Sequence, residues 1–229
     1  MSLMIATPCY GHKCHSEFAA SMVQLAEVMT GQGFSWTWYR HENDSLITRA
    51  RDVCAAAFLR ETDYQRLLFI DSDIVFTVDD VGKLWQMAEP FVVGCYTMKT
   101  LEAPYAAWRD GELVDLAKCP SEPFCVDYAG TGFMMIDRFV FEKLKTDNPD
   151  IVEYEEGKIG QCWNFFQDPV IDGFHCSEDY FFCRAWREIG GEVWMNPRVR
   201  LKHIGTHVFS GDTDGVDEPV ERPAAAAAG

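Results

Sequence analysis

The first hundred residues alternate between short apolar runs and longer stretches whose apolar residues fall on one helical face. The apolar runs, each suited to a buried strand, are Met4–Thr7, Phe34–Tyr39, Arg66–Ile70 and Phe91–Tyr96. Helices are expected to begin between these runs, at Ser16, Ser45 and Asp79. The third of them is expected to run from Val81 to Ala88. This repeated order of strand and helix predicts an α/β fold in which helices cover a mostly parallel sheet.

The second half of the chain has a less regular pattern. A glycine-bearing segment, Gly130-Thr131-Gly132, leads into an apolar strand that ends at Ile136. The stretch Asp147–Cys176 is acidic and has no clear periodicity, so we expect irregular structure there. After a predicted helix that opens at Ser177, two short strands are expected at Val193–Met195 and Arg198–Lys202.

No clear linker interrupts the chain before Gly211, so a single domain is predicted over residues 4–209. Its first half, 4–100, carries the strand–helix repeat, and its second half is 101–209. Residues 210–229 form an acidic and Ala-rich tail. The acidic segment from Phe209 to Arg222 is expected either to be mobile in the empty protein and become more ordered with metal and nucleotide sugar, or to stay disordered throughout.

Three polar loops follow the first three predicted strands and are therefore candidates for one site. They are Pro8–His15, His41–Asp44 and Asp71–Asp73. In open α/β sheets, ligands bind outside the carboxyl ends of the parallel strands. The strand order therefore predicts that these loops converge on one crevice.

The composition narrows the class of ligand. Lys and Arg number 20 against 36 Asp and Glu, a formal charge of −16. Such an acidic chain is poorly suited to nucleic acid, so an anionic ligand would need local arginine or a bound cation. The nine cysteines predict free thiols in a reducing compartment. With no signal peptide and no membrane span evident, we expect a cytoplasmic protein.

Asp71-Ser72-Asp73 is the sharpest chemical motif in the sequence. Two carboxylates in the turn after a buried strand can present oxygens to Mg²⁺ or Mn²⁺. The alternative is that aspartate at a strand end simply caps a turn. His203 ends a later predicted strand and is a candidate third metal ligand, with His207 as the alternative.

Two pairs of charged residues extend this candidate site. Glu178 and Asp179 open a predicted helix, where one carboxylate could accept a proton from an attacking hydroxyl. The alternative is that they only complement the helix macrodipole. Arg49 and Arg51 lie on the helix after the second loop, where a guanidinium could hold a diphosphate or simply face solvent.

In this order along the chain, the motifs resemble those of nucleotide-sugar glycosyltransferases of the GT-A fold. The resemblance covers roughly residues 4–209. The matching segments are Ala6-Thr7-Pro8 with Tyr10, Arg49-Ala50-Arg51, Phe69-Ile70-Asp71-Ser72-Asp73, Gly130-Thr131-Gly132-Phe133, Ser177-Glu178-Asp179-Tyr180-Phe181 and His203. More narrowly, the short chain resembles small virus- or bacterium-encoded sugar transferases. The stretch from Asp147 to Cys176 matches no motif of the family.

The resemblance implies a GT-A, Rossmann-like domain with a smaller acceptor-side sheet region. It implies a metal-dependent hexosyltransferase that moves a sugar from a UDP- or GDP-sugar to a hydroxyl of a glycan, glycoprotein or other acceptor. The implied nucleotide-sugar contacts are Thr7, Pro8, Tyr10, Asn43, Asp44, Arg49, Arg51, Asp71 and Ser72. The implied ligands of Mn²⁺ or Mg²⁺ are Asp71, Asp73 and His203. Gly130, Thr131 and Gly132 would contact a sugar, and Glu178 or Asp179 would act as base if the enzyme inverts.

Two other functions fit parts of the same pattern. A sugar-phosphate nucleotidyltransferase also combines a parallel sheet with acidic metal sites. It is expected to carry a Gly-rich basic loop after the first strand, which Pro8–Lys13 is not. A metal-dependent carbohydrate-binding module without catalysis is the other alternative. The sequence specifies neither the sugar, the acceptor nor the stereochemical course.

Overall fold

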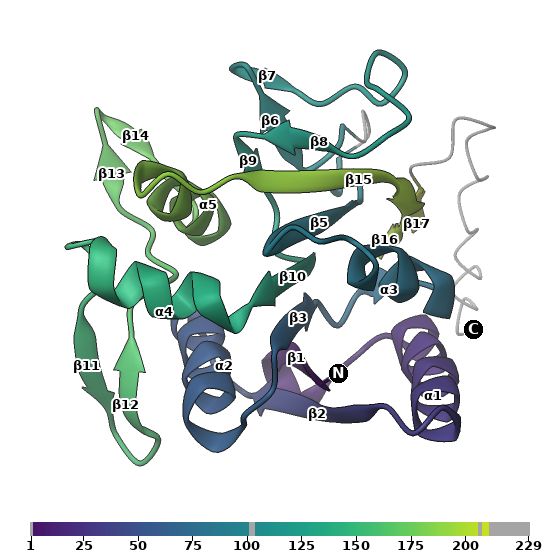
Figure 1. Cartoon of the computed structure of the whole chain (residues 1–229), viewed down its shortest axis with the longest axis horizontal. Helices are drawn as coiled ribbons and strands as arrows, with labels where there is room; N and C mark the ends of the chain where they lie inside the picture. The colour runs from purple at the N-terminus through teal and green to yellow at the C-terminus, as the bar shows by residue number, and fades with distance from the viewer. Residues whose placement is uncertain (1, 101–103, 206–207, 211–229) are drawn as a thin grey trace, which may run out of the picture.

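The fold is built around one central β-sheet. The structure is a computed structural model, which describes residues 2–100, 104–205 and 208–210 of the chain. Within these residues, seven strands pair in the order β2-β1-β3-β10-β5-β15-β8 (Figure 1). The strands that share one direction are β1 (Ser2–Cys9), β2 (Ser35–Glu42), β3 (Arg66–Ile70), β5 (Phe91–Cys95) and β15 (Val193–Arg200). The two that oppose them are β10 (Phe133–Asp137) and β8 (Phe124–Val126). The expected α/β fold with a mostly parallel sheet is confirmed.

Helices cover both faces of this sheet (Figure 1). One face carries α1 (Ser16–Gly31) and α3 (Val78–Trp85), and the other carries α2 (Ile47–Glu61), α4 (Arg138–Asp147) and α5 (Glu178–Glu188). Successive strand residues therefore enter different cores. In β1, Leu3 and Ile5 pack with α1 and α3, whereas Met4 and Ala6 pack with α2, α4 and α5. Burial on both faces explains why β1, β3 and β5 contain continuous apolar runs.

The segment 147–176, expected to be irregular, instead forms two β-hairpins. They are β11 (Glu153–Glu156) with β12 (Gly160–Trp163), and β13 (Val170–Ile171) with β14 (Phe174–His175). The sequence conceals the first hairpin because β11 is almost entirely acidic and alternates only between exposed and half-buried positions. Between the hairpins, Phe166 stacks on Phe182 of α5 with ring centroids 4.6 Å apart. This contact anchors the whole segment to the core beside α5.

Three predicted boundaries around the strand ends were wrong. Strand β1 does not stop before Pro8, because beyond Ala6 it pairs only with β2, and proline is tolerated on an edge. Helix α2 begins at Ile47, not Ser45, since the Asp44 carboxylate accepts the Leu46 N–H and forms the preceding turn.

Helix α3 also lies earlier than predicted, over Val78–Trp85 instead of 81–88. Thr77 is its N-cap and exchanges hydrogen bonds with Asp80 in a capping box. Asp79 and Asp80 therefore lie in the first turn of the helix and do not precede it.

The carboxyl-terminal part of the described chain brings His203 to the sheet edge. The two strands predicted over 193–202 are one irregular strand, β15, whose register shifts between Asn196 and Arg200. It is followed by β16 (Lys202–Ile204), which pairs with β4 (Ile74–Val75) and with β17 (Val208–Ser210). His203 pairs with Ile74 in this ladder, and Ile74 is the residue that follows Asp73 in the chain. The antiparallel pairing therefore places His203 beside the Asp71–Asp73 turn.

The smaller elements complete the second half of the chain. Strand β6 (Ala107–Arg109) pairs with β7 (Glu112–Leu113), and β9 (Tyr128–Ala129) joins them. A short 3₁₀ turn, η1, covers Tyr10–His12. His207 and the tail from Gly211 onward lie outside the described residues, so the predictions made for them stay predictions.

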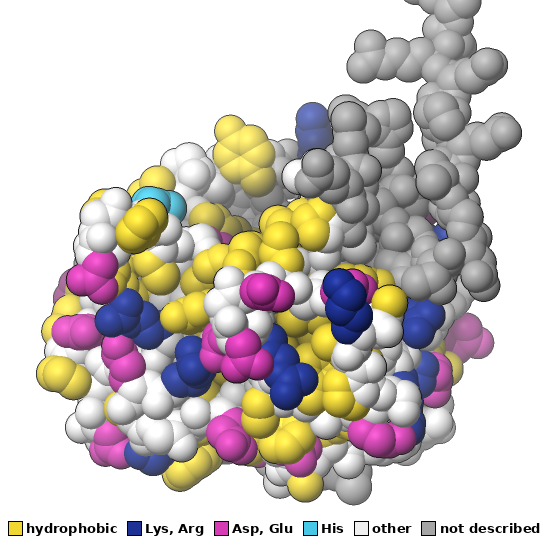
Figure 2. Space-filling model, turned by 90° about the horizontal axis from the view of Figure 1, so that it is seen from above, with side chains coloured by type: hydrophobic (Ala, Val, Ile, Leu, Met, Phe, Trp, Pro, Cys, Tyr) yellow, Lys and Arg dark blue, Asp and Glu magenta, His cyan; other side chains and the backbone are white. Residues whose placement is uncertain are grey.

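Three further properties of the described residues bear on expectations from the composition: the state of the cysteines, the hydropathy of the helices and the distribution of surface charge. All nine cysteines are free thiols, as predicted. Among the described helices, none combines the length and hydropathy needed to cross a bilayer. On the face shown in Figure 2, acidic and basic side chains are interspersed, with hydrophobic groups between them.

Candidate active site

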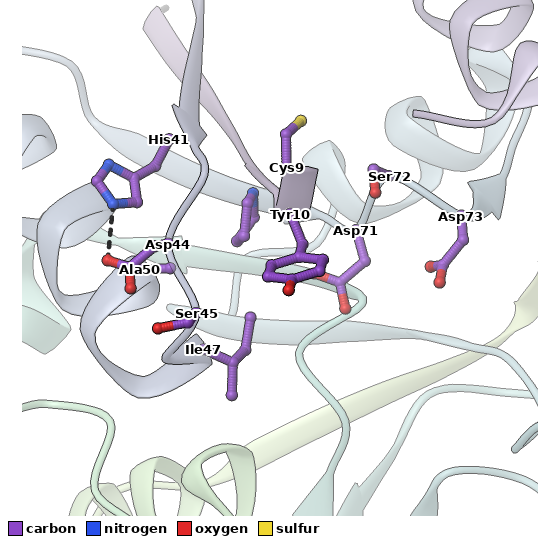
Figure 3. Close-up of a pocket in the computed structure, with 11 residues that line it drawn as sticks. Cys9, Tyr10, His41, Asp44, Ser45, Ile47, Ala50, Asp71, Ser72 and Asp73 are labelled. Carbon is purple, nitrogen blue, oxygen red and sulfur yellow. Dashed lines mark hydrogen bonds and ion pairs between the residues drawn. The ribbon is translucent and has the colours of Figure 1, made fainter. Parts of the chain in front are cut away.

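A cavity of about 270 Å³ lies where the carboxyl ends of β1, β2 and β3 meet. Its lining residues are Pro8, Cys9, Tyr10, His41, Asp44, Ser45, Ile47, Ala50, Asp71, Ser72 and Asp73. Figure 3 shows the Tyr10 ring between the Asp44 side and the Asp71 side. The three predicted loops thus converge on one crevice, as the strand order requires.

One wall of the cavity is an ordered network of charged side chains. Arg49 donates to Asp44 through Nε at 2.9 Å and through Nη2 at 2.7 Å. The His41 ring nitrogen Nε2 lies 3.0 Å from Oδ2 of the same carboxylate (Figure 3). The Arg49 hydrogen bonds hold the pKa of Asp44 well below its usual range. Asp44 is therefore an anion held in place, with its side chain only 6% exposed.

The opposite wall is the Asp71-Ser72-Asp73 turn, which the backbone fixes from three sides. The Ile74 N–H donates to the Asp71 carbonyl at 3.0 Å and closes the turn. The His15 N–H donates to the Ser72 carbonyl at 2.9 Å, and the Asp71 N–H donates to the Gly132 carbonyl at 3.1 Å. The turn therefore has little freedom to move.

The glycine segment supports this turn from behind. Gly132 also donates its N–H to the Tyr96 hydroxyl at 3.0 Å. A Cβ on Gly130 would lie 2.0 Å from that hydroxyl oxygen, so only glycine fits there. Gly130, Thr131 and Gly132 are buried and do not line the cavity. Their suggested contact with a sugar stays a prediction, while their packing explains the glycines.

Arg51 is buried between carboxylates and does not point into the cavity as a free guanidinium. It donates to the two carboxylate oxygens of Asp71 at 2.9 and 3.1 Å. Its Nε donates to Glu178 at 3.3 Å. Its side chain is 5% exposed. Arg51 therefore does not face solvent, and its donors join Asp71 to Glu178. Its suggested contact with a diphosphate stays a prediction.

Glu178 and Asp179, the two candidates for the catalytic base, lie in the first turn of helix α5, as predicted. Glu178 is tied to the cavity turn through Arg51. The Asp179 carboxylate accepts hydrogen bonds from the Ser177 hydroxyl and, at 2.9 Å, from the Tyr180 N–H. Burial, and then the charge of Glu178, raises the pKa of Asp179 to about 6. One carboxylate is thus bound to arginine, while the other is poised to exchange a proton near neutral pH.

Asp73 and His203 face one another in a way that suits a cation. His203 Nδ1 lies 2.8 Å from the Thr97 carbonyl, which can only accept, so Nδ1 carries the proton. A neutral His203 therefore turns its Nε2 lone pair towards Asp73 Oδ1, 3.5 Å away. That oxygen is buried without a hydrogen bond among the described residues. Two such lone pairs repel unless a proton or a metal ion lies between them.

A divalent cation fits this pair by the chemistry of its donors. Two ligands that each lie about 2.1 Å from one metal ion are roughly 3.0–3.5 Å apart at common coordination angles. The pKa of Asp73 is lowered although its burial acts to raise it, because the ion pair with Lys99 favours the charged form, so Asp73 is ionised. In the described part of the chain, no three His, Cys, Asp or Glu side chains cluster as a metal site. Asp71 is bound to Arg51, so Asp73 and His203 are the stronger candidates.

Lys99 also belongs to this site, although it was not predicted from the sequence. Its ammonium group forms an ion pair with Asp73 Oδ2. It follows β5, the fourth parallel strand, so the rule that located the other three loops would also have located this one. Lys99 thus occupies one face of the carboxylate that we expect to bind metal.

Four of the suggested nucleotide contacts lie outside the cavity lining, namely Arg49, Arg51, Thr7 and Asn43. Thr7 is fully buried, and its hydroxyl accepts from Trp38 Nε1 at 2.9 Å. Asn43 is exposed, with φ at 61°, and is absent from the lining residues. Pro8, Tyr10, Asp44, Asp71 and Ser72 do line the cavity.

Comparison with known proteins gives likeness of fold only. No protein-family model and no curated protein sequence matches the chain. A crystal structure of A197 from STIV matches 97% of this chain and 98% of its own, with 18% identity and a TM-score of 0.58.

Two other solved structures are similar at lower scores. The catalytic domain of a Drosophila beta1,4-galactosyltransferase 7, in complex with xylobiose, matches 86% of this chain and 66% of its own, with 11% identity and a TM-score of 0.48. The inositol-1-phosphate CTP transferase from T. maritima matches 85% and 87%, with 9% identity and a TM-score of 0.41. The structural neighbours thus include both a glycosyltransferase and a nucleotidyltransferase.

Proposed function

We propose that this protein is a metal-dependent glycosyltransferase that transfers a sugar from a UDP- or GDP-sugar to an acceptor hydroxyl. The observation that carries the proposal is the placement of Asp73 and His203 Nε2, 3.5 Å apart, beside a cavity at the carboxyl edge of the sheet. The donor nucleotide would lie in that cavity, against Tyr10 and Asp44. A glycan or glycoprotein is the expected acceptor.

The cation requirement follows from the charges around the cavity. Arg51 is committed to Asp71 and Glu178, and Arg49 to Asp44. Because both arginines are already paired with carboxylates, a bound cation is the better candidate to offset a diphosphate. Asp73 and His203 would instead hold Mn²⁺ or Mg²⁺, whose charge would stabilise the departing nucleoside diphosphate.

Glu178 and Asp179 would handle the acceptor proton if the enzyme inverts. The acceptor oxygen would form a bond to the anomeric carbon as the bond from that carbon to the diphosphate breaks. The hydroxyl proton would pass to a carboxylate of the pair, and the nucleoside diphosphate would leave as the anion. Asp179 suits this role because a base works best with a pKa near the working pH.

The nucleotidyltransferase alternative gains no support from the loop after β1. That loop is a short 3₁₀ turn over Tyr10–His12, and Gly11 is its only glycine. A non-catalytic carbohydrate-binding module would share the metal site but release no nucleotide. Two incubations with Mn²⁺ distinguish the three: one with a panel of UDP- and GDP-sugars, in which release of the nucleoside diphosphate is measured, and one with nucleoside triphosphates and sugar phosphates, in which release of pyrophosphate is measured. Release of the nucleoside diphosphate supports transfer, release of pyrophosphate from a nucleoside triphosphate supports the alternative, and no release supports the module.

Asp73→Asn should abolish metal-dependent donor binding while the fold is retained. The amide is the same size but carries no charge, so we expect affinity for Mn²⁺ and UDP or GDP to fall on the order of 100-fold. Calorimetry measures the affinity, and Asp79→Asn on α3 is the matched control with an exposed carboxylate. Unchanged affinity in Asp73→Asn would place the metal elsewhere.

Glu178→Gln and Asp179→Asn separate proton transfer from donor binding. At least one of the two should lower the transfer rate by about 10²–10⁴-fold while donor affinity changes little. Stopped assays of product and calorimetry of the donor give the two quantities. Full transfer activity in both variants would rule out the base role.

A further inference from the structure

A second groove lies on the other flank of helix α2. The first cavity is lined by Ser45, Ile47 and Ala50, and the second groove by Leu46, Thr48, Arg49 and Asp52. Its volume is about 470 Å³, and its far wall is the segment from Asn164 to Pro169 between the two hairpins. No residue lines both cavities, although they share one helix and Arg49, one of the suggested nucleotide-sugar contacts, lines the groove.

The groove presents hydrogen-bonding groups that the protein itself leaves free. In the described part of the chain, the Thr48 hydroxyl and the Asp168 carboxylate have no hydrogen-bond or ion-pair partner. Gln167 donates from Nε2 to the carbonyls of Asp150 and Asn164 at 2.9 and 3.1 Å. These bonds fix the amide and leave its oxygen available as an acceptor. A ligand here must therefore supply several donors of its own.

The floor of the groove carries little charge at neutral pH. Asp52 is 4% exposed and accepts from the Phe166 N–H at 2.9 Å and the Tyr154 hydroxyl at 3.2 Å. Its burial raises its pKa to about 8, so it is mostly neutral at pH 7. Arg49 and Glu156 lie 3.7 Å apart and offset one another. The groove therefore favours a neutral ligand over a phosphate.

Apolar side chains border these polar groups. Leu46, which is 53% exposed, and Pro169 both line the groove. Such groups suit the C–H face of a ring whose hydroxyls face the polar wall. Polyhydroxylated rings combine neutral charge, many donors and an apolar face.

We propose that this groove is a second carbohydrate-binding site, which takes neutral hexose or pentose units of a glycan without nucleotide or metal. It does not depend on the proposed transfer activity, since neither Asp73 nor Glu178 takes part in it. If the chain is a glycosyltransferase, the groove would retain the protein on a glycan while a hydroxyl reacts at the first cavity.

The test uses the whole chain, ¹⁵N-labelled, without metal or nucleotide. The probes are methyl glycosides of glucose, galactose, mannose, xylose, fucose and N-acetylglucosamine at up to 50 mM. We expect at least one of them to shift the amide signals of Thr48 and of residues 164–168. The double variant Thr48→Val, Asp168→Ala should weaken that binding at least five-fold, while Asp79→Ala should leave it unchanged. Both altered side chains lack partners, so the variant should fold.

Three results would overturn the proposal. They are no shift at residues 164–168 with any probe, shifts confined to the first cavity, or affinity that the double variant leaves unchanged. UDP with Mg²⁺, added in a separate titration, should shift amides near Tyr10 and Asp73 in both proteins. Loss of that second response alone counts against the donor site and not against the groove.

Discussion

Helix α2 separates two polar cavities that differ in how the chain builds them. On one flank, three turns that follow parallel strands meet, and two of their carboxylates, Asp44 and Asp71, are paired with arginines of α2. On the other, the helix faces a segment between two hairpins, and the floor is a carboxyl group that is mostly neutral. The comparison indicates that paired charges hold the first cavity together, whereas burial and hydrogen bonds hold the second.

The strongest test of this difference is to remove Arg51. Arg51→Met leaves Asp71 and Glu178 as neighbouring carboxylates without their shared cation. We expect the free energy of unfolding to fall by about 3–5 kcal/mol, as when one partner of a buried ion pair is lost. Urea unfolding at pH 7 measures the loss.

Arg49→Met is the matched control, two residues earlier on the same helix. The Arg49 side chain is 36% exposed, and Asp44 keeps its bonds to His41 and the Leu46 N–H. A loss below about 1 kcal/mol is therefore expected. Equal losses in the two variants would break the distinction between a buried and a surface guanidinium.

Asp52→Asn tests whether the second groove has a neutral floor. The pKa of Asp52 is about 8 in the folded protein and near 3.9 when unfolded, so the folded state binds the extra proton between these values. The native protein should then lose roughly 2–3 kcal/mol of stability between pH 6 and pH 9 from this group. Asparagine carries no such proton, so the variant should show less of this loss.

Urea midpoints at pH 6 and pH 9 for both proteins give the comparison. Asparagine can keep both contacts, because its oxygen accepts from Phe166 and its amide donates to Tyr154. If the two proteins lose stability in parallel, Asp52 is charged in the folded state and the two cavities are more alike than described.

Lys99→Met is expected to have the smallest effect. Lys99 pairs with Asp73, and its side chain is 35% exposed, so it competes only weakly with a metal ion. Its removal should raise the affinity for Mn²⁺ about two- to five-fold, the range of a surface ion pair. Calorimetry of Mn²⁺ alone measures this, and weaker binding would mean that Lys99 supports the metal site.

The first cavity could be located from the sequence because its polar residues follow the predicted parallel strands, whose carboxyl ends lie at one edge of the sheet. Each of its turns comes directly after an apolar run, so Asp44, Asp71 and Asp73 fall at one edge once the strands are parallel. The strand order does not predict the direction in which each side chain points. Arg49 and Arg51 look equivalent in the sequence, yet helix geometry turns one to the surface and the other into the core.

The second groove could not be located in this way. Its far wall depends on Phe166 stacking on Phe182, and its floor on the Phe166 N–H bonding to Asp52, a contact between distant positions. Hairpin β11–β12 is also hidden, since acidic residues occupy most of its first strand. Local periodicity carries no information on either point.

The pairing of β16 with β4 has a consequence for biosynthesis. During translation, Asp73 is synthesised long before His203, so a partly synthesised chain contains Asp73 but not His203. The three turns around the cavity belong to the first part of the chain and can fold as it emerges. The Asp73–His203 pair closes only when the late strand docks, so affinity for a metal ion should be among the last properties that the newly made protein acquires.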